Sequence, residues 1–212
     1  MRIIKRVSLF VCLLCLSAGA LWPERSLAQG PERRAFKSGG PENLVRVGHR
    51  SRDKLLSAGR TSTGGFEFST TELYEAHLYL DEEGARKAFE PFRGQSASSL
   101  AKDAKFQQAI IEADFPKMVV LTFDYKRSGR DIREDVAEQL GRGVKDAGKF
   151  LNYLRKDFEP GNEVLIRFSG QGVMTTVAGT DMQEIQNPEL ARALLKMFIG
   201  MGTLSDVGPL LK

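Results

Sequence analysis

The sequence predicts an α+β fold built on a large, mostly antiparallel sheet with a layer of helices on one face. The prediction rests on the order in which strand-like and helical patterns follow one another. Strand-like segments come first, followed by helices, one strand, a long helix, three more strands and a last helix. Runs of strands and runs of helices in this order are typical of α+β domains, whose helices gather on one face of the sheet.

The first 28 residues have the pattern of a secretory signal peptide. Basic residues precede an uncharged apolar run over 7–22, and the small residues Ser26 and Ala28 stand where a signal peptidase cleaves. A transmembrane anchor is the alternative, but the run is shorter than the ~20 apolar residues that span a bilayer. We therefore expect cleavage between Ala28 and Gln29, a periplasmic or secreted protein, and no membrane span after cleavage.

Cysteine content and charge narrow the functions open to the rest of the chain. Both cysteines, Cys12 and Cys15, lie in the predicted signal, which leaves no disulfide, thiolate nucleophile or cysteine metal site beyond it. The signal also carries +3 of the net charge of +4, so residues 29–212 carry +1. A balance this even gives no electrostatic footprint for nucleic acid.

The first half of the remaining chain predicts a lead-in, two strands and two helices. Residues 29–43 are rich in glycine, proline and charge, which indicates a flexible segment. Residues 44–80 are rich in aromatic and β-branched residues, as strands are. Asp81 is placed to cap a helix that stops at Pro91, and apolar residues at near-helical spacing predict a second helix over 98–114.

The second half completes a single domain over 44–212. An apolar strand over 117–125 precedes the longest periodic element, a helix over 131–154 whose apolar residues step by three or four. The remaining elements are a hairpin over 162–179, a short strand over 180–186, and a helix that begins at Pro188 with Asn187 as its cap.

Motifs of known catalytic sites are absent from the sequence. It has no G-x-S-x-G, no H-E-x-x-H, no phosphate-binding loop and no dinucleotide fingerprint. Its two histidines, His49 and His77, do not make a zinc site by themselves. The glycines within 169–172 suit a hairpin turn, and the acids at 81–83 suit the start of a helix. Composition and periodicity therefore predict no metal and no cofactor, and leave the function open.

Three stretches together match one known family. The first is the strand YEAHLYL (74–80), preceded by a Gly-Arg pair at 59–60, and the second is FPKMVVLTFDYKRSGRDIREDVAEQ (115–139). The third is GNEVLIRFSGQGVMTTVAG (161–179), followed by NPELARALLKMFIG (187–200). In order and spacing they resemble the chalcone isomerase-like family across the whole predicted domain. The likeness is greatest to the bacterial, signal-bearing branch.

The resemblance implies an open-faced β-sandwich with a ligand cleft between the sheet and its helices. In the plant enzymes of the family an arginine, a threonine, a tyrosine, a lysine and an asparagine work in that cleft. The corresponding positions, which are the candidate ligand-binding residues, are Arg60, Tyr74, Ile132, Asp135 and Gln139. Ile132 cannot donate a hydrogen bond, and Asp135 reverses the charge of the lysine and would repel an anionic substrate. The resemblance therefore argues against chalcone cyclisation and gives no confident catalytic residue.

We expect instead a protein that binds a small hydrophobic or amphipathic molecule, such as a fatty acid, in the cleft. In this hypothesis Arg60 anchors an anionic head, and apolar residues including Ile132 contact the tail. The alternatives are an isomerase or intramolecular lyase acting on an enone-like substrate, with Tyr74 as its polar contact, and an envelope module without a ligand. The sequence leaves open whether the chain is an enzyme, which ligand it binds and how it oligomerises.

His77 lies within the strand that carries Tyr74. Side chains alternate along a strand, so if Tyr74 faces the cleft, His77 and Glu75 face away from it. We therefore predict that His77 is a surface or small-sheet residue paired with Glu75. Haem ligation by His77 is the alternative, because some non-catalytic relatives in the broad family resemble haem binders. It requires a cavity on the far side of the sheet or a bulge that breaks the alternation.

Overall fold

The computed structural model of the protein describes residues 44–60 and 66–211, without the side chains of 54–60 and 66–70. The predicted signal at 1–28 and the lead-in at 29–43 thus lie outside the described residues. Within the described part of the chain, no helix has the length and apolar character needed to cross a membrane.

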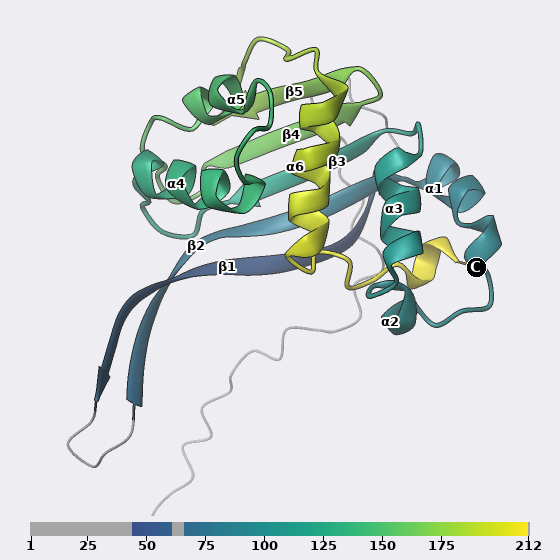
Figure 1. Cartoon of the computed structure of the whole chain (residues 1–212), viewed down its shortest axis with the longest axis horizontal. Helices are drawn as coiled ribbons and strands as arrows, with labels where there is room; N and C mark the ends of the chain where they lie inside the picture. The colour runs from purple at the N-terminus through teal and green to yellow at the C-terminus, as the bar shows by residue number, and fades with distance from the viewer. Residues whose placement is uncertain (1–43, 61–65, 212) are drawn as a thin grey trace, which may run out of the picture. The chain divides into compact units, whose positions relative to one another are not determined.

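Six antiparallel strands form one sheet in which every strand pairs with the next in sequence. The strands are β1 (Leu44–Arg60), β2 (Phe66–Asp81), β3 (Lys117–Thr122), β4 (Glu163–Ser169), β5 (Gly172–Val177) and β6 (Thr180–Asp181). Strand β3 pairs only with residues 75–80 of β2, so the far half of the β1–β2 hairpin extends beyond the rest of the sheet (Figure 1).

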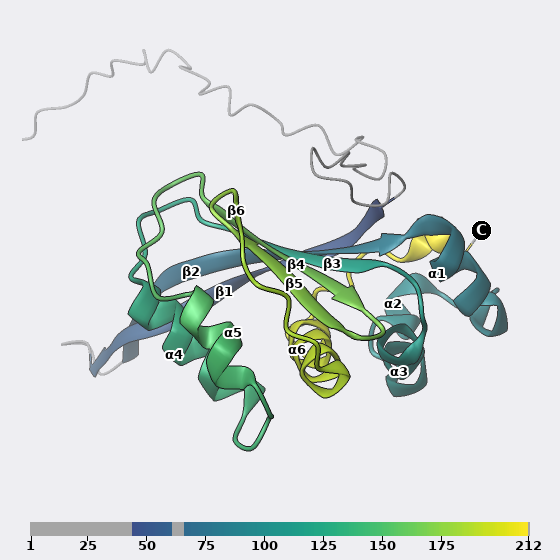
Figure 2. The same cartoon turned by 90° about the horizontal axis from the view of Figure 1, so that it is seen from above.

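The helices confirm the α+β architecture with a helical layer on one face. They are α1 (Glu82–Ala88), α2 (Ala97–Leu100), α3 (Ala104–Glu112), α4 (Gly129–Leu140), α5 (Ala147–Tyr153) and α6 (Pro188–Gly200), with 3₁₀ turns at Glu90–Phe92 and Gly208–Leu210. Figure 2 shows α3, α4, α5 and α6 on the same side of the sheet and α1 at its end. The predicted hairpin and the short strand after it are also present, as β4, β5 and β6.

Two of the predicted helix caps are confirmed by their hydrogen bonds. The Asp81 carboxylate accepts a hydrogen bond from the backbone N–H of Gly84 at 2.8 Å and begins α1. The Asn187 side-chain oxygen accepts from the N–H groups of Glu189 and Leu190 at 3.0 and 3.2 Å and begins α6. These contacts satisfy N–H groups that have no partner within the helix itself.

The single helix predicted over 131–154 is wrong, because the chain forms α4 and α5 with a break between them. Gly141 and Gly143 have φ angles of 79° and 88°, and Asp146, just before α5, has a φ of 63°. Glycine adopts this left-handed backbone without steric cost, which ends α4. The apolar spacing continued through the break because both helices bury residues against the same core. The helix predicted over 98–114 is likewise divided into α2 and α3, since Asp103 accepts from the N–H of Phe106 and caps a new helix that begins at Ala104.

Side chains alternate along β2 as predicted. Tyr74, Ala76, Leu78 and Leu80 face the helices and are all fully buried in the main core. The opposite face carries His77 and a smaller apolar cluster formed by Leu44, Tyr79, Met118 and Val120, with Leu165 at its edge. The helix-covered face is therefore the one on which a site between sheet and helices is built.

Candidate functional site

Strand register and helix spacing bring four polar side chains together on the helix-covered face. In the β1–β2 hairpin Arg52 lies directly opposite Tyr74. Helix α4 lies over this point and presents Asp135 and Gln139, four residues apart and therefore on one side of the helix. We call these four residues the Asp135 cluster.

The Asp135 carboxylate is the acceptor at the centre of the cluster. Its Oδ1 accepts from Arg52 Nε at 2.9 Å and lies 2.8 Å from an Nη atom of the same guanidinium. Its Oδ2 accepts from the Tyr74 hydroxyl at 2.9 Å and from Gln139 Nε2 at 2.6 Å. Gln139 Nε2 also lies 3.4 Å from the Tyr74 oxygen. Each of the other three side chains thus donates to one carboxylate.

Burial and charge fix the protonation of the cluster. Asp135 is 9% exposed and Tyr74 is fully buried, whereas the Arg52 side chain is 35% exposed. The hydrogen bond to Asp135 raises the pKa of Arg52. Burial, followed by the negative charge of Asp135, raises the pKa of Tyr74 far above its usual value. The cluster therefore holds an ion pair and a neutral phenol that acts as a donor.

The structure brings three of the five predicted site residues into contact with one another: Tyr74, Asp135 and Gln139. Ile132 lies one turn before Asp135 on α4 and is fully buried in the apolar core. Arg60 is at the far end of β1, opposite Phe66, and its side chain lies outside the described residues. The arginine of the cluster is Arg52, which the sequence did not indicate as a candidate.

A groove of about 630 Å³ adjoins the exposed side of the cluster. Arg52 and Gln139 line one part of it together with Leu140. Helix α6 supplies the remaining lining residues, which are Ala193, Lys196, Met197, Gly200 and Met201. The groove thus places two cationic side chains, Arg52 and Lys196, beside apolar ones. Tyr74 and Ile132 belong to the packed interior below, so the open volume is at the edge of the sheet–helix interface and not in its middle.

His77 is on the opposite face of the sheet, as strand alternation predicted. Its Nε2 lies 3.4 Å from the Glu75 carboxylate and 3.3 Å from the Thr122 hydroxyl. Its ring stacks on that of His49, its partner across the strands, with centroids 5.8 Å apart. Among the described residues, no set of three or more histidine, cysteine or acidic side chains could hold a metal ion. His77 is only 8% exposed, so it is not a surface residue, whereas the predicted pairing with Glu75 is present. Haem ligation stays an untested prediction.

Comparison with known proteins points to one fold. No family model matches the chain. Chalcone–flavanone isomerases of Gossypium hirsutum and Zea mays are 25% and 26% identical over 147 and 152 residues, or 60% and 63% of this chain. The matches cover 65% and 66% of those enzymes, slightly less than two thirds of their length. Chalcone–flavanone isomerase C of Petunia hybrida is 27% identical over 142 residues, 58% of this chain and 59% of its own.

A solved structure shows the same architecture. The crystal structure of an Arabidopsis thaliana fatty-acid binding protein superposes with a TM-score of 0.57, covering 80% of this chain and 93% of that protein. Sequence identity between the two is 14%. The six-stranded open sheet with helices on one face is therefore the chalcone isomerase-like fold, and the chain is distantly similar to chalcone isomerases.

Proposed function

We propose that this chain is an exported chalcone isomerase-like protein that binds a fatty-acid-like amphipathic molecule without cyclising chalcones. The observation that carries the proposal is the groove beside the Asp135 cluster, which combines two cations with apolar walls. The similarity in fold to a protein described as a fatty-acid binding protein supports the same class of ligand. The groove volume lies in the range of ~300–1,000 Å³ that is usual for small-molecule sites.

The two ends of such a ligand would meet different chemistry in the groove. Its carboxylate would lie between Arg52 and Lys196, and its alkyl chain would lie along Leu140, Met197 and Met201. Methionine side chains are flexible and polarisable and fit irregular apolar shapes. A guanidinium carries five N–H donors. The contacts to Asp135 use Nε and one Nη of Arg52, which leaves donor capacity for a ligand oxygen on its solvent-exposed side.

Asp135 would set the strength of this interaction. It already pairs with Arg52, so an incoming carboxylate meets a cation whose charge is largely balanced. Binding would then depend on Lys196 for net positive charge and on the apolar walls for affinity. This arrangement favours a carrier that releases its ligand readily over one that holds it permanently.

The buried part of the cluster argues for binding over catalysis. An isomerase acting on an enone would need a polar side chain that reaches the reacting atoms. The Tyr74 hydroxyl is fully buried and donates to Asp135, and Ile132 has no donor. Loss of turnover on an enone in Tyr74→Phe, if any such turnover exists, would support the enzyme alternative.

The decisive experiment measures displacement of a fluorescent fatty acid by palmitate, alongside native mass spectrometry of the purified protein. We expect the wild type to bind, and Lys196→Glu to weaken binding about tenfold, or ~1.4 kcal/mol. The matched control is Lys105→Glu, which makes the same change on an exposed part of α3 outside the groove. No binding by the wild type, or equal effects of the two variants, would contradict the proposal.

Export is a separate part of the proposal and has its own test. The protein expressed with its native N-terminus should be recovered from the periplasm or medium with Gln29 as its first residue. Intact mass spectrometry measures this directly. A chain that retains Met1 and stays in the cytoplasm would contradict export without affecting the ligand-binding proposal.

A further inference from the structure

Lys117 is a lysine at a core-facing position that the proposed groove does not use. It is the first residue of β3 and pairs with Leu80 and Phe168, which both face the helices. The residue is only 6% exposed. Lysine is rarely buried to this degree unless it has a partner, so its surroundings need a physical explanation.

The amine of Lys117 contacts two main-chain carbonyls. Its Nζ donates to the carbonyl of Ala113, at the end of α3, and to the carbonyl of Phe115 at 3.2 Å. It also lies 4.3 Å from the centre of the Phe115 ring. Among the ion pairs of the described residues, none includes Lys117. A neutral amine has two N–H groups, which two carbonyls satisfy, whereas an ammonium has three.

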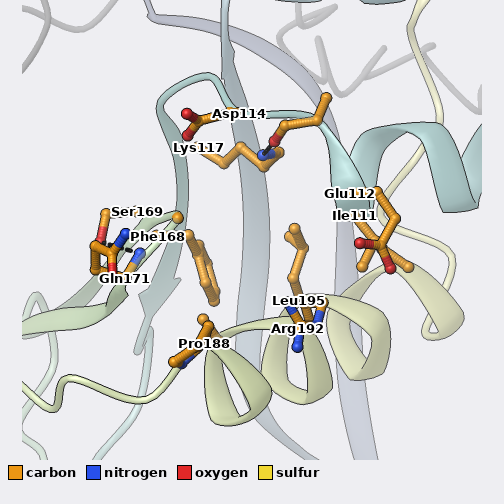
Figure 3. A pocket seen from close by; sticks show the side chains of 13 residues that line it. Ile111, Glu112, Asp114, Lys117, Phe168, Ser169, Gln171, Pro188, Arg192 and Leu195 are labelled. Carbon is orange, nitrogen blue, oxygen red and sulfur yellow. Dashed lines mark hydrogen bonds between the residues drawn. The ribbon is translucent and has the colours of Figure 1, made fainter.

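Two pockets meet at this amine. One of about 260 Å³ lies between the end of α3, the β4–β5 turn and the start of α6, and Figure 3 shows Lys117 and Asp114 on one side of it and Arg192 on another. The second has a volume of about 290 Å³ and a mainly apolar lining that includes Leu44, Phe115, Met118 and Phe168. Lys117 lines both pockets, so its side chain lies where they adjoin.

The same burial changes the acid–base behaviour of the side chain. Desolvation lowers the pKa of Lys117 to about 8, and the nearby charges of Asp114 and Glu112 oppose this only in part. In contrast, hydrogen bonds to Glu159 and Asp146 raise the pKa of the exposed Lys126 and Lys149. Near neutral pH the neutral, nucleophilic fraction of Lys117 is on the order of a hundredfold larger than that of an ordinary lysine.

From the buried amine, its two carbonyl acceptors and the adjoining pockets, we propose that Lys117 is a covalent attachment site for a short aliphatic aldehyde. The alkyl chain would occupy the apolar pocket. The nitrogen lone pair forms a bond to the carbonyl carbon while the π electrons move to oxygen. After a proton moves from nitrogen to that oxygen, the carbinolamine loses water and leaves an imine. The step needs no oxidant or reductant.

A structural role makes the opposite prediction. If Lys117 only satisfies the carbonyls of Ala113 and Phe115 just after α3, its amine is shielded and should react more slowly than surface lysines. The test treats the full-length protein with hexanal and sodium cyanoborohydride at pH 7.5, and measures alkylation of each lysine by peptide mass spectrometry. We expect Lys117 to react at least about tenfold faster than Lys126 and Lys149, given its larger neutral fraction. Equal or slower reaction, or reaction only in urea, would overturn the proposal.

Two variants test the site itself. Lys117→Arg keeps a donor for the carbonyls and should remove the fast-reacting site. Pro116→Trp adds bulk at an exposed position that lines the apolar pocket. It should slow reaction of Lys117 with hexanal at least about fivefold while leaving its reaction with formaldehyde unchanged, because only hexanal needs the pocket. Equal slowing of both aldehydes would overturn the pocket assignment, and circular dichroism checks that each variant is folded.

Discussion

Arg52 and Lys117 both extend from the helix-covered face of the same sheet, but they differ in their partners. Arg52 donates to the carboxylate of Asp135, and its pKa is raised. Lys117 donates to the carbonyls of Ala113 and Phe115, and its pKa is lowered. Burial disfavours the charged form of both, so the partner decides the outcome.

The difference teaches which chemistry each region can support. A full negative charge within hydrogen-bond distance keeps a cation charged, which suits electrostatic attraction of an anionic ligand. The carbonyls that Lys117 contacts carry no full negative charge and do not offset its desolvation, so a larger neutral fraction remains. Helix α6 borders both regions, with Lys196 on the groove and Arg192 on the Lys117 pocket, so one helix separates two sites of opposite character.

Removing the carboxylate from the cluster should have the largest effect on stability. Asp135→Ala leaves the Arg52 charge without its partner and the buried Tyr74 hydroxyl without its acceptor. We expect a loss of about 4 kcal/mol in the free energy of unfolding, measured by urea denaturation. Glu134→Ala, the neighbouring exposed position on α4, is the control and should change stability by less than about 0.5 kcal/mol. A similar small loss in both variants would mean that the cluster contributes little.

The Lys117 region should show the next largest effect, as a dependence of stability on pH. Its pKa is about 8 in the folded chain and close to the usual 10.5 in the unfolded chain. Between these values the unfolded state binds more protons, so the free energy of unfolding rises with pH. The wild type should therefore gain up to about 3 kcal/mol relative to Lys117→Met between pH 8 and 10.5.

The measurement is urea denaturation of both proteins at several pH values. Lys105→Met, at an exposed position of α3, serves as the control and should track the wild type. If the difference between wild type and Lys117→Met stays constant across this interval, the amine is as solvated as a surface lysine. That result would remove the contrast with Arg52.

Much of the fold could be predicted from local sequence signals, because strand alternation and helix caps depend on neighbouring residues. Asp81 and Asn187 cap helices as predicted, and β2 buries the expected face. The break between α4 and α5 was missed because the apolar spacing continues across Gly141 and Gly143. The positive φ angles that these glycines adopt end the helix, and apolar spacing alone does not reveal them.

The site was harder to predict because it depends on cross-strand register. The arginine next to Tyr74 is fixed by pairing along the β1–β2 hairpin, whose bulges shift the register near Arg46, Arg52 and Leu55. The two shifts between this pair and the end of the hairpin offset each other, so Arg52 and Tyr74 each lie eight residues from the pair Arg60 and Phe66. Local patterns do not fix which residues form that end pair, so they do not identify Arg52. The sequence predicts Lys117 only as part of an apolar strand. Its burial depends on the neighbouring strands and on contacts with the chain just after α3, which the strand pattern does not reveal.

The smallest expected effect tests the neutral phenol of the cluster. The pKa of Tyr74 is raised above its usual value near 10, chiefly by burial and then by Asp135. Above pH 10 the unfolded chain therefore loses this proton first, and the free energy of unfolding falls with pH by up to about 1.4 kcal/mol per unit. Tyr74→Phe should remove this contribution, so its stability falls less steeply than that of the wild type between pH 10 and 11.

Tyr125→Phe, at a residue that is 61% exposed, is the matched control and should keep the wild-type slope. Parallel slopes for wild type and Tyr74→Phe would show that the phenol ionises in the folded state, which the contact with a buried carboxylate opposes.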